Sequence, residues 1–368
     1  MSRGVGPPFG PVSGTGRGAD NGGDGDVLVL RALGLGDAFA GVAALRGVRR
    51  AFPARRLVLA APAGVGSWLR DHGIVDDVLP TSGLDQPLAY DGTGHVAVNL
   101  HGRGPQSHRL LASTHPDELV AFGCAKASHA GPEWRPDEHE VDRWCRLVRS
   151  AGGDCSPEDL RIPVPDASGG RVRVGASAAH TPRAPHGGPA RREDTAAPVV
   201  VHPGAASNAR RWSAERWTAV AGELAATRHE VVVTGSGDEV PLCEQIAADA
   251  GPGVRSVAGT LDLSGLAEVV AGARLLVCGD TGVAHLATAF ATPSVLLFGP
   301  TPPAWWGPAI DPHLHAVLWH GTGPGDPHAD TVDPALEAID VEEVVRSAHH
   351  LLATTGAPES PPQSARCR

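Results

Sequence analysis

Two patterns of apolar residues alternate along most of the chain. Short continuous apolar runs, typical of buried strands, are followed by stretches in which apolar side chains recur every three or four positions, as in amphipathic helices. This alternation predicts an α/β protein built on parallel sheets. The predicted strands are residues 27–30, 57–60, 77–80, 95–100, 199–202, 231–234, 254–257, 275–278 and 294–298. The predicted helices include residues 39–48, 65–72, 138–151, 217–224, 264–271, 282–287 and 337–352, with one more beginning at residue 241.

Two strand–helix series, separated by a stretch without periodicity, predict two domains. The first is residues 25–165 and the second residues 198–320, and 368 residues can form two cores of ordinary size. Residues 166–197, rich in Gly, Ala, Pro, Ser and Arg, are a predicted flexible linker. We expect disordered tails at residues 1–24 and 356–368, and a C-terminal segment at residues 321–355 whose helix packs back on the first domain. Ligands are expected between the two sheets.

Charge and cysteine usage narrow the classes of partner and compartment. A formal net charge of −10 argues against nucleic acid or an anionic membrane as the main partner. The six cysteines are scattered without a C-x-x-C pair, so neither a disulfide framework nor a structural zinc site is expected. The chain has no signal-peptide pattern and no apolar stretch of about 18 residues. We therefore expect a cytoplasmic protein with at most peripheral membrane contact.

The segment at residues 275–287 predicts an anion site. Its apolar run ends in a glycine, and Asp280, Thr281 and Gly282 then lead into residues at helical spacing. Backbone N–H groups in the first turn of such a helix, together with its dipole, favour a phosphate, and Thr281 and His285 can add donors. The alternative is an ordinary helix cap at Asp280 or Thr281 with His285 packed in the core.

The turn after the first strand carries a candidate functional carboxylate. Gly34 and Gly36 precede Asp37 at the start of a helix. The third glycine of a dinucleotide fingerprint is replaced by Phe39, and the one lysine, Lys126, lacks the preceding glycine pattern of a Walker P-loop. Asp37 is either a helix N-cap or a carboxylate at the carboxyl edge of the sheet, where α/β domains place their chemistry.

A second polar turn follows the strand at residues 95–100. It groups an imidazole, a guanidinium and an amide from His101, Arg103 and Gln106. These groups at the carboxyl end of a strand suit a polyol or a phosphorylated ligand, and an ordinary polar loop is the alternative. Several turns of the second half combine Gly with Ser, Thr or Asn, which is the composition of a phosphate- and ribose-binding rim.

A set of ordered segments is specific in combination, although no single one is. The segments are LRALGLGD at 30–37 with ALR at 44–46, NLHG at 99–102, HPGA at 202–205 with RRW at 210–212 and ERW at 215–217, TGS at 234–236, CGDTGxxHLA at 278–287 and PSVLLFGPT at 293–301. Through them, over roughly residues 27–300, the chain resembles glycosyltransferase family 9, the ADP-heptose:lipopolysaccharide heptosyltransferase family.

The resemblance implies a GT-B architecture, in which two Rossmann-like domains face a central cleft, and a sugar transfer that inverts the anomeric centre. It implies that Asp37 is the general base for the acceptor hydroxyl and that the donor is a nucleotide-diphosphate sugar, expected to be ADP-heptose. Arg210 stands where the family commonly has a lysine, and the choice between Asp238 and Glu239 as the ribose ligand stays open. The expected donor-binding residues are Ser207, Asn208, Arg210, Gly235, Glu239, Asp280, Thr281, Gly282 and His285.

The same resemblance implies a saccharide or glycolipid acceptor, as in lipopolysaccharide core biosynthesis, bound by His101, Arg103 and Gln106. No cofactor or metal is expected, because Arg210 and helix N–H groups can stabilise the leaving diphosphate. Asp24-Gly25-Asp26 matches the D-x-D pattern of metal-dependent glycosyltransferases, but it precedes the first strand and is interpreted as chance. Two alternatives remain: a sugar-nucleotide epimerase, which needs further acid/base residues, and a non-catalytic nucleotide-sugar-binding protein.

Overall fold

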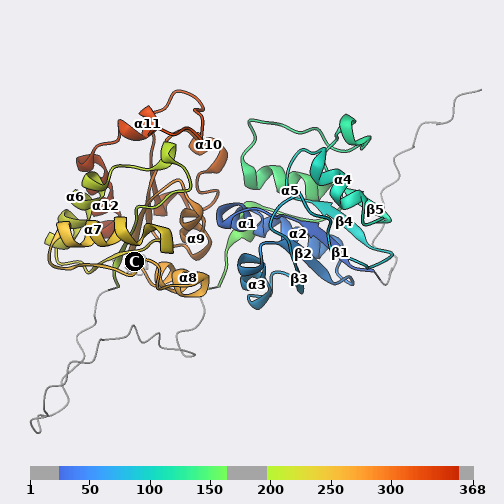
Figure 1. The fold of residues 1–368 in the computed structure, drawn as a ribbon, viewed down its shortest axis with the longest axis horizontal. Helices are drawn as coiled ribbons and strands as arrows, with labels where there is room; N and C mark the ends of the chain where they lie inside the picture. The colour runs from blue at the N-terminus through green and yellow to red at the C-terminus, as the bar shows by residue number, and fades with distance from the viewer. Residues whose placement is uncertain (1–24, 164–196, 356–368) are drawn as a thin grey trace, which may run out of the picture.

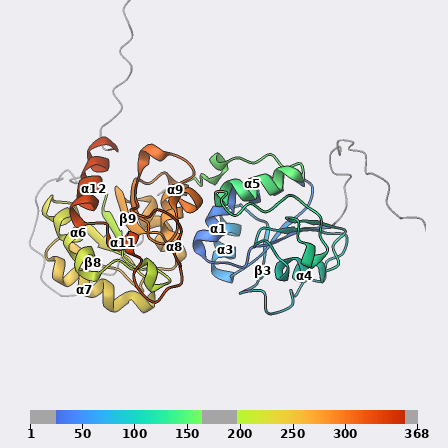
Figure 2. The same cartoon turned by 90° about the horizontal axis from the view of Figure 1, so that it is seen from above.

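Two parallel β-sheets with helices packed on them form two units that lie side by side (Figure 1). The structure is a computed structural model and describes residues 25–163 and 197–355. The first sheet has five strands in the order β3-β2-β1-β4-β5, and the second has six in the order β11-β10-β9-β6-β7-β8. Figure 2 shows the same two halves from above. The predicted α/β class and two-sheet GT-B arrangement are confirmed. The predicted tails, most of the linker, and Asp24 lie outside the described residues.

The first unit is built around four consecutive buried apolar residues in β1, a run that suits a parallel strand covered on both faces. Its strands are β1 (Val27–Leu30), β2 (Leu57–Ala61), β3 (Asp77–Pro80), β4 (Val96–Asn99) and β5 (Glu118–Val120). Its helices are α1 (Leu35–Ala40), α2 (Val42–Ala51), α3 (Ala63–Asp71), α4 (Gln106–Ala112) and α5 (Glu140–Ser150), with 3-10 turns η1 (Ala125–Ala127) and η2 (Pro157–Leu160).

The second unit repeats this arrangement around β6 and β9, which are buried along their whole length. Its strands are β6 (Val199–His202), β7 (Val231–Val233), β8 (Val254–Ser256), β9 (Leu275–Gly279), β10 (Ser294–Leu297) and β11 (His315–Leu318). Its helices are α6 (Ala214–Ala226), α7 (Val240–Ala250), α8 (Leu263–Ala271), α9 (Gly282–Phe290), α10 (Pro303–Trp306), α11 (Pro334–Glu337) and α12 (Val341–Thr355). Its 3-10 turns are η3 (Asn208–Arg210), η4 (Gly237–Glu239) and η5 (Pro312–Leu314).

The helix α12 corrects one prediction. We expected the C-terminal helix to pack on the first domain, but α12 lies against α6 and against β9, β10 and β11 of its own sheet. Its buried residues Val344, Ala348 and Leu351 belong to the same core cluster as the strands β6 and β9. The apolar face of this helix therefore completes the second core and does not join the two units.

The sequence pattern did not predict α4, β5 or β11. The inward face of α4 carries Ser107 and His108, which are buried but polar, so the helical periodicity of apolar residues is hidden. The edge strands β5 and β11 are short and only partly buried, and they lack a continuous apolar run. Gln106, predicted to lie in a loop, is the first residue of α4.

The cysteines give a second correction. Cys145 of α5 and Cys155 form a disulfide with their Cα atoms 5.2 Å apart, although the scattered cysteines predicted no disulfide framework. Both side chains are buried in the first core, where the turn after α5 folds back on this helix. Among the helices of the described ranges, none has the combination of length and hydropathy needed to cross a membrane.

The two units meet along α1 and α9, which contact each other closely. One core cluster extends through the junction: the rings of Trp68 and Phe290, one from each unit, lie 6.4 Å apart. A backbone hydrogen bond also joins the units here, from the Ile162 amide to the Ala289 carbonyl at 2.9 Å. The N-terminal ends of α1 and α9 are thereby fixed next to each other.

Replacing Leu351 by alanine tests the position of α12. Leu351 is 4% exposed, and deletion of its buried methyl groups is expected to destabilise the second unit by about 2–5 kcal/mol in denaturant unfolding. Arg346→Ala, on the exposed face of the same helix, is the control and should change stability by less than about 0.5 kcal/mol. Equal effects of the two substitutions would contradict the observed packing.

Candidate active site

Three adjoining cavities lie where the two units meet. The middle one, about 520 Å³, is lined by Asp37 from α1 and by Arg210, Asp280 and His285 from the second unit. A larger cavity of about 650 Å³ shares Thr281 with it and extends over the turn after β7. A third, of about 420 Å³, shares Asp37 with the middle cavity and extends over the turn after β4. Asp37 thus lines the middle and the third cavity. The start of α9 lines the middle cavity and the 650 Å³ cavity.

Glycine at two positions permits this junction. A Cβ atom on Gly282 would lie 2.8 Å from the Leu35 Cβ and 2.9 Å from the Gly36 amide nitrogen. A Cβ atom on Gly36 would lie 3.0 Å from Cδ2 of His285. Glycine is therefore required at positions 36 and 282, because α1 and α9 approach too closely there for a side chain.

The start of α9 has the features of an anion site. Thr281 is the N-cap in extended conformation, and its hydroxyl makes no capping hydrogen bond. The first N–H groups of a helix have no partner within the helix, so they are available to a ligand. Asp280 is buried, and burial raises the pKa of its carboxyl above 3.8, while Arg210 and a hydrogen bond with Thr301 act in the opposite direction. Asp280, Thr281 and Gly282 all line the middle cavity.

Arg210 reaches this cavity from η3. Its Nη1 donates to the backbone oxygen of Asp280 at 3.5 Å and its Nε to the Ser207 hydroxyl at 3.4 Å, both long hydrogen bonds that a stronger acceptor can replace. The Ser207 hydroxyl itself donates to the Pro327 carbonyl at 2.6 Å. Asn208 is exposed and accepts a hydrogen bond from Arg211 at 3.1 Å. Of the three residues predicted in this segment, Arg210 lines the middle cavity, whereas Ser207 and Asn208 line none of the three cavities described above.

The turn after β7 forms one wall of the largest cavity. Gly235, Asp238 and Glu239 all line it. The Glu239 carboxylate accepts hydrogen bonds from the Ser236 amide at 2.8 Å and the Ser236 hydroxyl at 3.0 Å, whereas Asp238 is exposed. Glu239 therefore stabilises the turn through hydrogen bonds, whereas Asp238 faces solvent.

Sequence reasoning missed other residues of this wall. His202, Arg211 and Asp262 also line the largest cavity. The Nδ1 atom of His202 lies 2.9 Å from the Thr234 hydroxyl, and burial lowers the pKa of His202 to about 4. The position of His202 at the end of a predicted strand was the available signal, because parallel strands meet their ligands at that edge.

Asp37 lies in the first turn of α1, with its side chain 32% exposed toward the cavities. It makes no capping hydrogen bond, since Gly34 is the N-cap of α1. Burial raises the pKa of Asp37 above its ordinary value of 3.8, and Glu140 adds to this, while Arg31 and Arg210 lower it. The carboxylate is therefore a stronger base than a solvated aspartate.

His285 lies one turn into α9, beside Gly36. Burial lowers the pKa of its imidazole to about 4, and His139 and Arg31 act in the same direction. The ring is therefore neutral at neutral pH and offers a hydrogen bond instead of a charge. It is 6.0 Å from the ring of Trp306, which lines the same cavity from α10.

The third cavity collects part of the predicted acceptor set. His101 and Arg103 line it, whereas Gln106 does not and is exposed on α4. The pKa of His101 is lowered to about 4 by burial and by Arg31, and its Nδ1 atom is buried without a hydrogen-bond partner. The sequence did not point to the aromatic lining of this cavity, which consists of Trp134, Trp144, Trp305 and Trp306.

Asp26, the described aspartate of the D-x-D segment, lies elsewhere. Asp26 pairs with Arg56, with Oδ2 2.9 Å from Nη2, and accepts a hydrogen bond from the Tyr90 hydroxyl at 3.3 Å. It precedes β1, at the edge of the sheet opposite Asp37. In residues 25–163 and 197–355, no group of three or more His, Cys, Asp or Glu side chains is arranged to hold a metal ion.

A family comparison agrees with this geometry. The model for glycosyltransferase family 9 (heptosyltransferase) matches residues 125–323, more than half of the chain. The chain belongs to glycosyltransferase family 9. The resemblance inferred from the sequence motifs is thus confirmed.

Individual relatives are more distant. Lipopolysaccharide heptosyltransferase 3 of Escherichia coli is 30% identical over 166 residues, which are 43% of this chain and 48% of that protein. Lipopolysaccharide heptosyltransferase 1 of Pseudomonas aeruginosa is 53% identical over only 47 residues, 13% of each chain. The matches thus span about half, or less, of these curated relatives.

Solved structures share the fold over nearly the whole chain. A family 9 glycosyl transferase from Veillonella parvula superimposes with a TM-score of 0.69 at 18% identity, covering 92% of this chain and all of that one. The E. coli ADP-heptose heptosyltransferase II superimposes with a TM-score of 0.67 at 17% identity, covering 90% of this chain and 100% of that one. At these identities the likeness concerns the fold alone.

We predict that the His285 imidazole stays neutral from about pH 5 upward, because its desolvated surroundings oppose protonation. The measurement is a ¹⁵N NMR titration of the imidazole groups, with His285 assigned by the signal lost in His285→Gln. Exposed His350 on α12 serves as an internal reference. A His285 titration midpoint near 6.5, the ordinary pKa of histidine, would contradict the buried, neutral ring.

Proposed function

We propose that this chain is a metal-independent inverting glycosyltransferase that moves a heptose, or a closely related sugar, from ADP-heptose to a hydroxyl group of a saccharide or glycolipid. The observation that carries the proposal is that Asp37 and the start of α9 line one cavity from opposite units. The membership in family 9 and the names of its heptosyltransferase relatives support heptose as the sugar and a lipopolysaccharide-type acceptor.

The donor would occupy the two larger cavities. Its nucleoside fits the 650 Å³ cavity beside Gly235, with either Asp238 or Glu239 near the ribose. Its diphosphate fits the start of α9, where Thr281, Gly282 and Arg210 line the 520 Å³ cavity. The neutral His285 can donate a hydrogen bond to the sugar or to a phosphate oxygen. Ser207 supports Arg210 from behind and is proposed to act only through it.

The reaction then needs one proton acceptor and one stabilised leaving group. The acceptor oxygen forms a bond to the anomeric carbon as the bond from that carbon to the diphosphate oxygen breaks, and Asp37 takes the hydroxyl proton. The negative charge that develops on the departing ADP meets Arg210 and the helix N–H groups. Such fixed donors supply the charge stabilisation for which other transferases use a cation.

The acceptor would bind in the 420 Å³ cavity next to Asp37. Two of its tryptophans, Trp134 and Trp144, come from the first unit, and Trp305 and Trp306 come from α10 of the second. Indole rings suit the apolar faces of sugar rings, while His101 and Arg103 can hydrogen-bond hydroxyl or anionic groups. Gln106 lies outside this cavity and is not retained in the proposed acceptor set.

A thermal-shift screen tests the donor. ADP-heptose should raise the melting temperature more than GDP-, UDP- and dTDP-sugars, because a ligand bound only by the folded chain adds about 2.7 kcal/mol at a hundred times its Kd. Arg210→Ala should abolish most of this shift, whereas Arg346→Ala, on the exposed face of α12, should leave it unchanged. A screen in which no nucleotide-diphosphate sugar raises the melting temperature would argue against the donor site.

Replacing Asp37 by asparagine tests the base. The carboxamide cannot take a proton, so we expect ADP formation from ADP-heptose with a panel of saccharide acceptors to fall about a hundred- to ten-thousandfold, with donor affinity retained. Asp71→Asn, an exposed aspartate of α3, is the matched control and should retain wild-type turnover. Wild-type turnover in Asp37→Asn, or an epimerised donor formed without acceptor, would overturn the proposal.

A further inference from the structure

A buried group of charges stands directly behind Asp37, away from the proposed donor. Arg31, which follows β1, is 1% exposed and directs all three guanidinium nitrogens to partners. Its Nε donates to the backbone oxygen of Asp37 and its Nη1 to the Leu100 carbonyl at the end of β4. Its Nη2 lies 3.2 Å from Oε1 of Glu140 and 3.8 Å from Oδ1 of Asp37.

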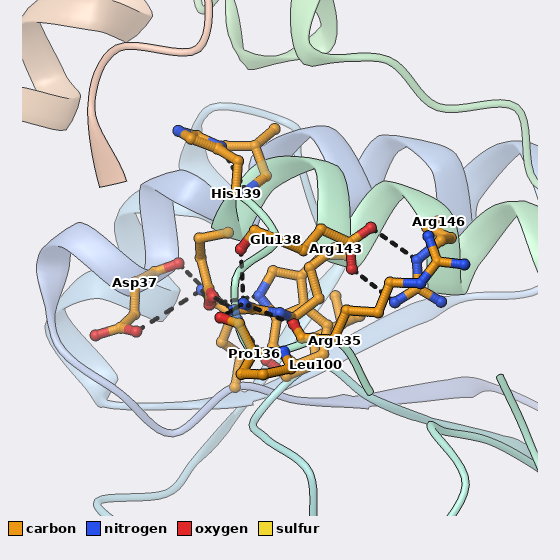
Figure 3. Close-up of polar contacts among 12 residues, drawn as sticks. Asp37, Leu100, Arg135, Pro136, Glu138, His139, Arg143 and Arg146 are labelled. Atoms are coloured by element: carbon orange, nitrogen blue, oxygen red, sulfur yellow. Dashed lines mark hydrogen bonds and ion pairs between the residues drawn. The ribbon is translucent and has the colours of Figure 1, made fainter. Parts of the chain in front are cut away.

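Glu140, the first residue of α5, is fixed by its own partners. Its Oε1 accepts a hydrogen bond from the Trp144 indole at 2.6 Å, and its Oε2 accepts one from Arg143. Arg143 in turn donates to the carbonyls of Pro136 at 3.0 Å and Glu138 at 2.6 Å (Figure 3). The position of Arg31 is thus determined by a carboxylate that cannot easily move.

Backbone geometry around Arg31 is equally restrictive. A Cβ atom on Gly41, at the junction of α1 and α2, would lie 2.8 Å from both Cδ and Nε of Arg31. The guanidinium also lies over the ring of Trp144, with its carbon 5.2 Å from the ring centre. Arg31 therefore has one position, in which it connects the peptide of Asp37, the turn that carries His101, and the start of α5.

Such a network is not explained by stability alone. Two buried ion pairs cost desolvation free energy, and well-packed apolar side chains of similar volume are often as stable. Here the charges of the network can act on Asp37, since Glu140 and Arg143 line the proposed acceptor cavity together with it. A positive and a negative group near one partly buried carboxylate act on its proton affinity in opposite directions.

We propose that Arg31 and Glu140 are positioning residues for the general base: Arg31 holds the peptide and carboxylate of Asp37 in place, and Glu140 holds Arg31 and offsets its charge. This inference rests on the proposed role of Asp37. The balance keeps Asp37 ionised at neutral pH while leaving it more basic than it would be beside an unpaired arginine.

Other groups facing Asp37 come from every neighbouring element. Arg210 of η3, Asp280 and His285 line the same cavity from the second unit, and the charge of Arg210 lowers the pKa of Asp37. His101, Arg103 and Arg143 line the acceptor side, and His328 closes the middle cavity. His101 and His285 have pKa values lowered to about 4, so they are neutral above about pH 5 and gain charge only at the acid end of the Asp37 titration. All these groups are left unchanged by the variants below.

The test compares Arg31→Gln, Glu140→Gln and the double variant in the full chain. The titration of the Asp37 side-chain carboxyl carbon is followed by ¹³C NMR, with its signal assigned by its absence in Asp37→Asn. Loss of the positive charge should raise the Asp37 pKa and loss of the negative charge should lower it, each by about one unit, with the double variant between them. The acid limb of ADP formation from ADP-heptose should move in the same two directions.

Two further variants keep the test decisive. Glu138→Gln removes a carboxylate that pairs with Arg146 at 2.6 Å near the same end of α5, and should leave the Asp37 titration unchanged. If Arg31→Gln fails to fold, Gly41→Ala keeps every charge and only displaces Arg31, and should lower kcat about ten- to a hundredfold with the donor KM unchanged.

Asp37 titrations that do not move in Arg31→Gln and Glu140→Gln, or that move in the same direction, would overturn the positioning role. So would a Gly41→Ala variant with wild-type kcat. These results are separable from failure of the proposed function, which would show as full ADP formation by Asp37→Asn. The variants of Arg31, Glu140 and Gly41 therefore test the positioning role separately from the proposed function.

Discussion

The close approach of α1 and α9 is the constraint on which the site depends. The two helices start at turns from different sheets, and their backbones come so near that a side chain on Gly282 would collide with Leu35 and with the Gly36 amide. Because both turns lie at the carboxyl ends of parallel strands, this contact brings the reactive edges of the two sheets together. It leaves Asp37 beside a helix start whose N–H groups have no partner within the helix.

Electrostatics within this junction follows from burial. The surroundings disfavour charge on Asp37, Asp280, His101 and His285, so the histidines are neutral and the carboxyls have raised pKa values. Arginine opposes this trend at both carboxylates, through Arg31 and Arg210. The site thus combines a proton acceptor and an anion-binding helix start without relying on a charged histidine. In the proposed reaction these are the two groups that sugar transfer from a nucleotide diphosphate requires.

Much of this arrangement could be predicted from the sequence, because buried parallel strands have continuous apolar sequences and the turns after them are short. The segments ending at Asp37 and at Asp280 were identified for that reason. Site residues from distant elements were not identified. Glu140 and Trp144 belong to a helix whose apolar face predicts only packing. Trp305 and Trp306 lie after a proline turn, in a segment without periodicity. The position of α12 and the Cys145–Cys155 bond likewise depend on which surfaces meet in three dimensions, which periodicity does not encode.

The most direct test of the account is a crystal structure of the full chain with ADP bound. The account predicts the diphosphate at the first turn of α9 within hydrogen-bond distance of Arg210, the adenosine beside the turn after β7, and the Asp37 carboxylate facing the terminal phosphate across an open cavity. ADP bound outside this junction, or an Asp37 carboxylate turned away from the bound diphosphate, would contradict it.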